Sequence, residues 1–189
     1  MFQVRIHGRG GQGVVTAAEL LAQSAFDEKR FAQAFPSFGS ERTGAPVVAF
    51  CRIADSEIRV REPIMVPDAI IIQDSTLLKQ IDVFSGLKND GYALINSTRT
   101  FEELGIADIA HNHPRIITVP ATAMAMEHLG RPVPNAVLLG AFAALTEVIS
   151  LHSVTDAITE KFQPKVAASN CAAATAAYEY VLAMVPANA

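Results

Sequence analysis

The beginning of the chain has the pattern of a strand, a glycine turn and a helix. Residues 2–7 alternate apolar and polar side chains, as in a β-strand, and residues 14–26 repeat apolar side chains every three to four positions, as in a helix. Between them lies Gly8-Arg9-Gly10-Gly11-Gln12-Gly13. Glycine adopts positive φ angles and the first N–H groups of a helix lack partners, so this turn is suited to bind an anion.

Strand and helix patterns alternate along the next hundred residues. Apolar runs predict strands at 31–36, 47–53, 68–73, 92–96 and 115–120, and helical spacing predicts helices at 77–81, 101–104 and 121–129. The turn at 54–57 and the alternating residues 58–61 predict a β-hairpin formed by 47–53 and 58–61.

The last third of the chain, from Asn135 onward, is helical in pattern. Asn135 is a candidate cap for an apolar helix beginning at Ala136, a shorter helix is expected at 155–162, and Pro164 opens a final helix rich in alanine. Together the patterns predict an α/β fold: one domain spanning 1–189, a sandwich with a mainly parallel sheet, a β-hairpin insertion and a helical C-terminal third. A ligand is expected at the strand ends near the first crossover.

The glycine turn also fits the dinucleotide fingerprint G-x-G-x-x-G. A nicotinamide fold places an acidic residue at the end of the second strand to hold the ribose. Here the strand 31–36 ends at Pro36 without an acid, and Asp27 and Glu28 precede it. The turn therefore predicts phosphate binding more strongly than NAD binding.

Composition and charge narrow the class of protein. A chain of 189 residues is long enough for one substantial core, and with 50% hydrophobic and 18% charged residues it is either a subunit that buries surface against partners or a chain with a helix-rich, alanine-rich core. The net charge of −4, without a Lys/Arg cluster, argues against nucleic acid as a partner. No apolar run reaches the roughly 18 to 20 residues of a membrane span, and the N-terminus lacks a signal-peptide pattern, so we expect a cytoplasmic protein without a membrane partner.

Few other residues suggest chemistry. Cys51 and Cys171 fit a reducing compartment and are too few to hold an iron–sulfur cluster. His111 and His113 lack a third metal ligand nearby, and His7, beside the glycine turn, is either a ligand contact or a structural histidine. No Ser-His-Asp pattern, HExxH, CxxC or thiamine signature is present, so no catalytic residue is predicted.

Arg42 is the notable isolated cation. It lies in the loop Pro36-Ser37-Phe38-Gly39-Ser40-Glu41-Arg42-Thr43-Gly44-Ala45-Pro46, which follows the second strand. A planar guanidinium at this place suits a second phosphate. The alternative is a salt bridge at the protein surface, to Glu41 or another acid.

Three motifs in register give a more specific indication: Arg5-x-His7-Gly8-Arg9-Gly10-Gly11-Gln12-Gly13, Phe35-Pro36-Ser37-Phe38-Gly39-Ser40-Glu41-Arg42-Thr43-Gly44, and Pro134-Asn135 before a Leu-Gly-Ala helix. With these the chain resembles, over its whole length, the gamma subunit of the 2-oxoacid:acceptor oxidoreductase family, of the pyruvate:ferredoxin oxidoreductase type.

The resemblance implies a multi-subunit enzyme that oxidatively decarboxylates a 2-oxoacid to an acyl-coenzyme A and passes electrons to ferredoxin or another acceptor. It places thiamine diphosphate, Mg and [4Fe-4S] clusters in partner subunits of alpha, beta and delta type, arranged as a dimer of heteromers. This chain would then be a non-catalytic subunit that contributes packing and part of the coenzyme A site.

The same resemblance directs two loops toward coenzyme A. The residues concerned are Gly8, Arg9, Gly10, Gly11, Gln12 and Gly13 of the first turn, and Ser40, Arg42, Thr43 and Gly44 of the second loop. Single-chain relatives carry lysines where this chain has Glu41 and Arg42, so Arg42 keeps a cation at this place and Glu41 does not.

Two other functions stay open from the residues alone. One is a free-standing NAD(P)- or flavin-binding oxidoreductase that uses the same turn, and the other is a purely structural scaffold. If the chain is a gamma subunit of this family, pyruvate is the expected substrate. A branched-chain 2-oxoacid, 2-oxoglutarate or an aryl glyoxylate such as phenylglyoxylate would suit a subunit of the same design.

Overall fold

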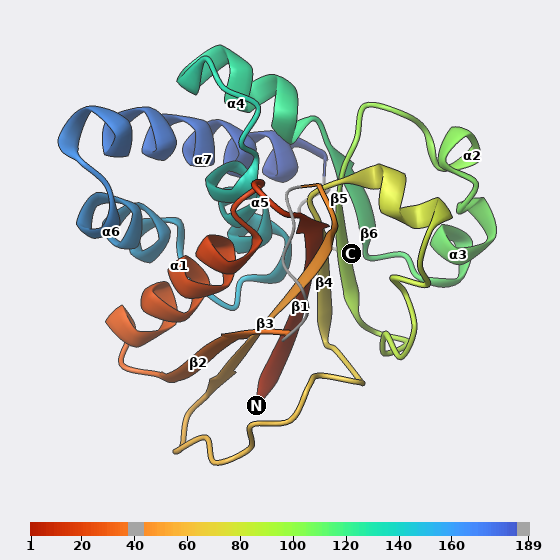
Figure 1. Cartoon of the computed structure of the whole chain (residues 1–189), viewed down its shortest axis with the longest axis horizontal. Helices are drawn as coiled ribbons and strands as arrows, with labels where there is room; N and C mark the ends of the chain where they lie inside the picture. The colour runs from red at the N-terminus through yellow and green to blue at the C-terminus, as the bar shows by residue number, and fades with distance from the viewer. Residues whose placement is uncertain (38–43, 185–189) are drawn as a thin grey trace.

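The computed structural model describes residues 1–37 and 44–184 and shows a twisted sheet with helices on both faces (Figure 1). The strand order is β2-β3-β1-β4-β5-β6. The strands are β1 (Phe2–Arg9), β2 (Phe31–Pro36), β3 (Pro46–Ala54), β4 (Ala69–Ile72), β5 (Tyr92–Asn96) and β6 (Ile116–Val119). The strands β1, β4, β5 and β6 run parallel to one another, while β3 is antiparallel to both β1 and β2. The predicted α/β class with a mainly parallel sheet is confirmed.

The antiparallel partner of β3 differs from the predicted one. We expected residues 47–53 to pair with 58–61, but β3 lies between β2 and β1, and 58–61 form no strand. The carbonyls of Val60 and Glu62 instead accept hydrogen bonds from the guanidinium of Arg52, at 3.4 and 2.5 Å. The antiparallel hairpin of this fold is therefore formed by β2 and β3.

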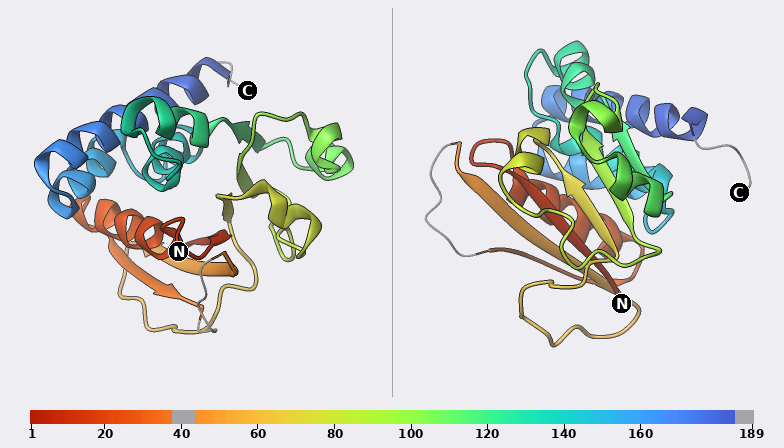
Figure 2. Two further views of the ribbon diagram at one scale, coloured as in Figure 1. Left: turned by 45° about the horizontal axis from the view of Figure 1, so that its top comes forward. Right: turned by 90° about the vertical axis from the view of Figure 1, so that its right-hand side faces the viewer.

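The helices form two unequal layers, as the views of Figure 2 show. Their bounds are α1 (Val14–Asp27), η1 (Ser75–Lys79, a 3₁₀ helix), α2 (Phe101–Leu104), α3 (Ala107–Asn112), α4 (Ala121–Leu129), α5 (Asn135–Thr146), α6 (Leu151–Lys161) and α7 (Pro164–Met184). The larger core joins one face of the sheet to α1 and to α4–α7, and the smaller core joins the other face to η1, α2 and α3. The predicted helical C-terminal third is confirmed, with α6 beginning four residues earlier than expected.

Helices α5 and α7 touch backbone to backbone. A Cβ on Gly140 of α5 would lie 1.9 Å from the carbonyl oxygen of Ala174 in α7, so only glycine fits there. Ala174 of α7 thus lies close to the backbone of α5. None of the helices in the described part of the chain is long and apolar enough to cross a bilayer.

The two layers meet at one point of the sheet. α1 leaves the carboxyl end of β1 toward the larger core, whereas η1 leaves the carboxyl end of the adjacent parallel strand β4 toward the smaller core. Such a divergence opens a crevice at the strand ends, where α/β proteins bind ligands. The predicted place for a ligand, near the first crossover, is at this switch point.

Candidate functional site

The glycine turn joins β1 to the N-terminus of α1. Gly11 and Gly13 have φ angles of 94° and 72°, which side chains rarely adopt, and Gly13 is the N-cap of α1. No side chain of residues 1–37 or 44–184 caps this helix end, and its first turn carries no acidic residue. Unpaired N–H groups and the positive end of the helix dipole therefore remain available to an anion.

Two glycines of the turn are fixed by close neighbours. A Cβ on Gly8 would lie 2.6 Å from Cγ2 of Val14, and one on Gly13 would lie 2.5 Å from Nδ2 of Asn135. The first contact packs the strand end against α1. The second brings the start of α5 against the turn, so the turn is a junction of three elements.

The turn is also tied to the start of η1. Gln12 accepts a hydrogen bond from the N–H of Arg9 and donates one to Asp74 Oδ2 at 3.0 Å, and Arg9 Nε donates to the same oxygen at 3.1 Å. Asp74 caps η1 by accepting a hydrogen bond from Thr76 N. Burial acts to raise the pKa of Asp74, but hydrogen bonds from Thr76 and Gln12 and the charge of Arg9 hold it below its usual value.

The second predicted loop meets the glycine turn at its described end. Gly44 N donates to the carbonyl of Gly10 at 3.1 Å, and the Gly44 carbonyl accepts from the Arg9 guanidinium at 3.0 Å. Ser40, Arg42 and Thr43 lie outside the described residues. Arg9 also donates to Thr76 and Gln80, so its guanidinium clamps loops together.

One cleft at this end of the sheet, the glycine cleft, has a volume of about 400 Å³. Its walls come from the glycine turn and α1, from the α4–α5 connection, and from α7. They are lined by Gly11, Gly13, Thr16, Leu129, Arg131, Val133, Asn135, Phe162, Lys165, Val166, Ser169 and Asn170. Two exposed cations, Arg131 and Lys165, thus share a cleft with the N-terminus of α1.

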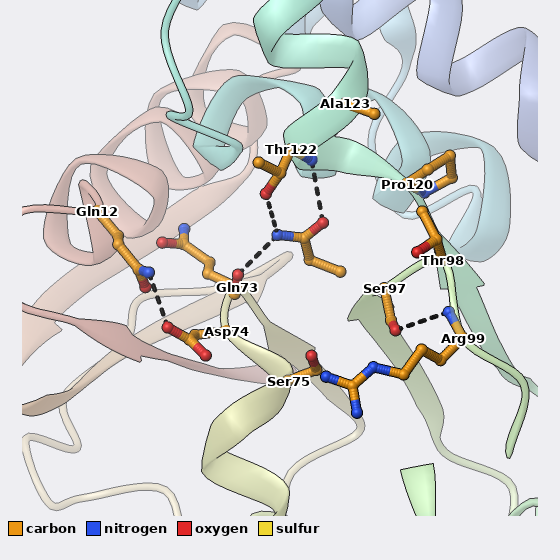
Figure 3. A pocket seen from close by; sticks show the side chains of 11 residues that line it. Gln12, Gln73, Asp74, Ser75, Ser97, Thr98, Arg99, Pro120, Thr122 and Ala123 are labelled. Carbon is orange, nitrogen blue, oxygen red and sulfur yellow. Dashed lines mark hydrogen bonds between the residues drawn. The ribbon is translucent and has the colours of Figure 1, made fainter. Parts of the chain in front are cut away.

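The second cleft, the switch-point cleft, has a volume of about 300 Å³ and lies across the carboxyl ends of β4, β5 and β6 (Figure 3). It is lined by Gln12, Gln73, Asp74, Ser75, Asn96, Ser97, Thr98, Arg99, Pro120, Thr122 and Ala123. Asn96 organises its floor: its Nδ2 donates to the Gln73 carbonyl and to Thr122 Oγ1 at 2.8 and 2.7 Å, and its Oδ1 accepts from Thr122 N at 3.0 Å.

His7 lines neither cleft. It is 5% exposed, and its Nε2 accepts a hydrogen bond from Arg5 Nε at 3.0 Å. Burial, and secondarily the charge of Arg5, lowers the pKa of His7 to about 3, so the ring is neutral at physiological pH. Of the two interpretations left open by the sequence, this arrangement favours the structural one.

Several residues of the clefts were not singled out by the sequence. Arg131 lies in the α4–α5 connection, and Lys165 and Asn170 lie in α7, so no local motif links them to the glycine turn. Asn135 did give a signal, as part of the Pro134-Asn135 motif, but it was interpreted as a helix cap. The structure places the N-cap at Pro134 and brings the amide of Asn135 against Gly13.

Metal-binding side chains and cysteines are the remaining candidates for chemistry. No group of three or more His, Cys, Asp or Glu side chains is placed to hold a metal ion in residues 1–37 and 44–184. Cys51 and Cys171 are both free, and burial raises the pKa of the Cys51 thiol, which keeps it protonated.

The geometry defines the class of protein as an α/β domain with a glycine turn, a helix N-terminus and two exposed cations in one cleft at the end of its sheet. Comparison with known proteins is specific. The family model described as pyruvate ferredoxin/flavodoxin oxidoreductase matches residues 3–180. The pyruvate synthase subunit PorC of Methanothermobacter marburgensis is 48% identical, with 95% of this chain and 97% of the relative covered. The common gamma subunit of the pyruvate and ketoisovalerate oxidoreductases of Pyrococcus abyssi is 42% identical, with 95% and 96% covered.

Solved structures agree with this grouping. The pyruvate oxidoreductase subunit PORC of Thermotoga maritima superimposes with a TM-score of 0.79 at 34% identity, over 94% of this chain and 95% of that one. A 2-oxoglutarate:ferredoxin oxidoreductase of Magnetococcus marinus, with 2-oxoglutarate, coenzyme A and succinyl-CoA bound, shares the fold with a TM-score of 0.77 at 17% identity. That match covers 99% of this chain and 32% of that one.

The chain belongs to the pyruvate ferredoxin/flavodoxin oxidoreductase family. It is a gamma subunit, the non-catalytic subunit of a multi-subunit pyruvate/2-oxoacid:ferredoxin oxidoreductase. The expectation drawn from the three sequence motifs is confirmed, and the alternative of a free-standing NAD(P)- or flavin-binding oxidoreductase is not favoured.

Proposed function

We propose that this subunit supplies the phosphate-binding part of the coenzyme A site, and that the glycine cleft is that part. The observation that carries the proposal is that one cleft combines the uncapped N-terminus of α1 with the cations Arg131 and Lys165. Coenzyme A carries a diphosphate and a 3′-phosphate. Backbone N–H groups at a helix start bind one such group without a side chain, and two cations suit the other.

The shape of the turn fits this ligand. A Cβ on Gly11 would meet no atom of the described residues within 4 Å, and a phosphate can therefore approach the backbone closely. Asn135 and Asn170 are 5% and 4% exposed and line the same cleft, so their amides offer directed hydrogen bonds. The apolar side chains of Leu129, Val133 and Phe162 give a surface for the adenine ring.

The second loop completes the proposed site. Gly44 lies against Gly10, which brings the end of this loop to the glycine turn. We therefore retain Gly8 to Gly13, Ser40, Arg42, Thr43 and Gly44 as coenzyme A residues, with Arg42 as a further phosphate ligand. An Arg42→Ala enzyme is expected to have a raised KM for coenzyme A, and an unchanged KM would remove Arg42 from the site.

Substrate and partners extend the same proposal. Pyruvate is the proposed substrate, supported by the pyruvate synthase relative. Because the Pyrococcus relative is common to pyruvate and ketoisovalerate enzymes, substrate choice is assigned to other subunits. Thiamine diphosphate, Mg and the [4Fe-4S] clusters are assigned to partners of alpha, beta and delta type in a dimer of heteromers, with ferredoxin as acceptor. Purification of the native complex, followed by subunit identification and a panel of 2-oxoacids, tests this assignment.

The coenzyme A site is tested by calorimetric titration of the chain and by steady-state kinetics of the assembled enzyme. The variant Arg131→Met/Lys165→Met should bind coenzyme A at least about tenfold more weakly, because two charge-assisted contacts are lost. Arg59→Met is the matched control, since Arg59 is an exposed cation paired with Glu57 far from the cleft. An assembled double variant with full turnover and an unchanged KM for coenzyme A would exclude the glycine cleft.

A further inference from the structure

We infer that the switch-point cleft is a second binding site, which takes a small molecule with one phosphate or carboxylate group and is separate from the coenzyme A site. The proposal goes beyond the proposed function and does not depend on it. It rests on a buried side chain without partners, on donors that converge on the cleft, and on the lining of the cleft.

The first observation is Gln73, at the end of β4. The residue is 1% exposed, and neither its Nε2 nor its Oε1 has a hydrogen-bond partner in the described part of the chain. A buried amide without partners costs free energy, so folded proteins seldom keep one unless something else satisfies it. Gln73 lines the switch-point cleft, and in Figure 3 its amide lies between Gln12 and Thr122.

The second observation is the N-terminus of α4, which opens onto the same cleft. Its N-cap is Pro120, which provides no side-chain cap, and the N–H of Thr122 is occupied by Asn96. Within residues 1–37 and 44–184 the N–H of Ala123 has no acceptor. This N–H group, the helix dipole and the Nε2 donor of Gln73 would all attract an anion in the cleft.

The third observation is a cation at the mouth of the cleft. Arg99 is exposed, and its guanidinium makes no hydrogen bond to the described residues; Figure 3 shows it extending toward Ser75. The carboxylate in the cleft, Asp74, already accepts bonds from Arg9, Gln12 and Thr76, and Arg9 balances its charge. An incoming anion therefore meets Arg99 without an opposing free carboxylate.

The lining selects the size and type of ligand. Ser75, Ser97 and Thr98 add hydroxyl groups, while the apolar residues are limited to Pro120 and Ala123. An adenine ring would find no apolar platform here, whereas a compact phosphate or carboxylate would find donors on several sides. A small phosphorylated or carboxylated metabolite is therefore favoured over a nucleotide.

The two clefts share no lining residue. The glycine turn separates them, since Gln12 faces the switch-point cleft and Gly11 and Gly13 face the glycine cleft. Helix α4 spans the distance between them: its N-terminus borders one and Leu129, at its C-terminus, borders the other. An anion in the switch-point cleft should therefore bind while coenzyme A occupies the glycine cleft.

The test is a titration of the full-length chain with inorganic phosphate, and in parallel with acetate, in the presence of saturating coenzyme A. Calorimetry follows the binding of both anions, and the ³¹P line width follows the binding of inorganic phosphate. We expect saturable binding that Arg99→Met weakens at least about tenfold, because it removes the one charge-assisted contact. Gln73→Glu should weaken it similarly, since the change keeps the size of the side chain and replaces a donor by a negative charge. Gln73→Leu provides a second variant if Gln73→Glu does not fold.

The control is Arg131→Met/Lys165→Met, which should leave phosphate binding unchanged while it weakens coenzyme A binding. Conversely, Arg99→Met should leave coenzyme A binding unchanged, so the two proposals fail separately. The inference is overturned if the chain binds neither anion, if the anions compete with coenzyme A, or if the Arg99 and Gln73 variants bind as the unaltered chain does. Loss of phosphate binding in the assembled enzyme would also overturn it, because a partner subunit would then fill the cleft.

Discussion

Gly13 and Asn135 are 122 positions apart in the sequence, yet a single methyl group on Gly13 would lie 2.5 Å from the side-chain amide of Asn135. Gly13 also has a φ of 72°. Substitution of Gly13 by alanine would therefore both strain the backbone and cause a steric clash, whereas most glycines in turns would show only one of these effects.

Gly13→Ala should lower the free energy of unfolding by more than the roughly 1 to 2 kcal/mol that a left-handed backbone alone costs an alanine. Gly105→Ala is the matched control, because Gly105 has a φ of 73° with no neighbour within 4 Å of the added atom. Urea unfolding of both variants measures the difference. Equal losses of stability would show that Asn135 moves aside at no cost.

His7 should make the stability of the subunit depend on pH. Its folded pKa of about 3 lies below the value near 6.5 of an unfolded histidine, so the unfolded chain binds the extra proton between these pH values. The contribution of neutral His7 to the free energy of unfolding is complete above pH 6.5 and is lost as the pH falls toward 3. The free energy of unfolding should fall by about 2 kcal/mol between pH 7 and pH 5 for this reason.

His7→Gln keeps a hydrogen-bond acceptor for Arg5 and removes the titration. Urea unfolding at pH 7 and pH 5 should therefore show a smaller loss of stability in the variant than in the unaltered chain. The His152→Gln variant serves as the control, because His152 is exposed. A pH dependence that is identical in all three proteins would contradict the neutral, buried state of His7.

Asp74 should have the same direction of pH dependence at lower pH. Its folded pKa is lowered, so the stability it confers is present above the ordinary aspartate pKa of about 4 and is lost as the pH falls through the folded value. Asp74→Asn should reduce the free energy of unfolding at pH 7 by about 1 to 3 kcal/mol, since Arg9 and Gln12 lose a charged acceptor. The difference between the two proteins should shrink at acid pH, and a difference that is constant down to pH 2 would assign no role to the charge.

Gln73→Leu should make the chain more stable rather than less in phosphate-free buffer. The substitution removes a buried amide that lacks partners, and such a group costs about 1 to 3 kcal/mol. Thermal unfolding with and without phosphate measures this: the variant should begin with a higher Tm and gain less from the anion. A lower Tm in anion-free buffer would indicate that the amide is satisfied in solution, for example by water.

The fold followed from the sequence where the signal was local. The period of apolar residues placed β1, α1 and α4 well, and Pro164 marked the start of α7. The partner of β3 was wrong because pairing is not local. Residues 58–61 alternate like a strand, but Arg52 binds the carbonyls of Val60 and Glu62, and β3 pairs instead with the preceding strand β2 and with β1 at the start of the chain.

The residues of the site, too, could be predicted where they are neighbours in the sequence and not where they are distant. The glycine turn was visible because its residues are contiguous, and its association with the loop ending at Gly44 came from a resemblance. Arg131, Lys165, Gln73 and Arg99 gave no signal, because each is an ordinary polar residue until the fold places it beside a helix start. Only the packing of separate elements shows that they line clefts.

The contact of Gly140 with Ala174 has a consequence for recognition. Asn135 begins α5 and Asn170 belongs to α7, so two helices that touch at the backbone hold both amides at a set separation. The wall of the glycine cleft that contains Asn135 and Asn170 is then preorganised, so a ligand that binds there causes little loss of conformational entropy in these two helices. If the glycine cleft binds coenzyme A as proposed, differences in coenzyme A affinity among gamma subunits should follow the identity of the charged residues at positions 131 and 165 rather than a rearrangement of helices.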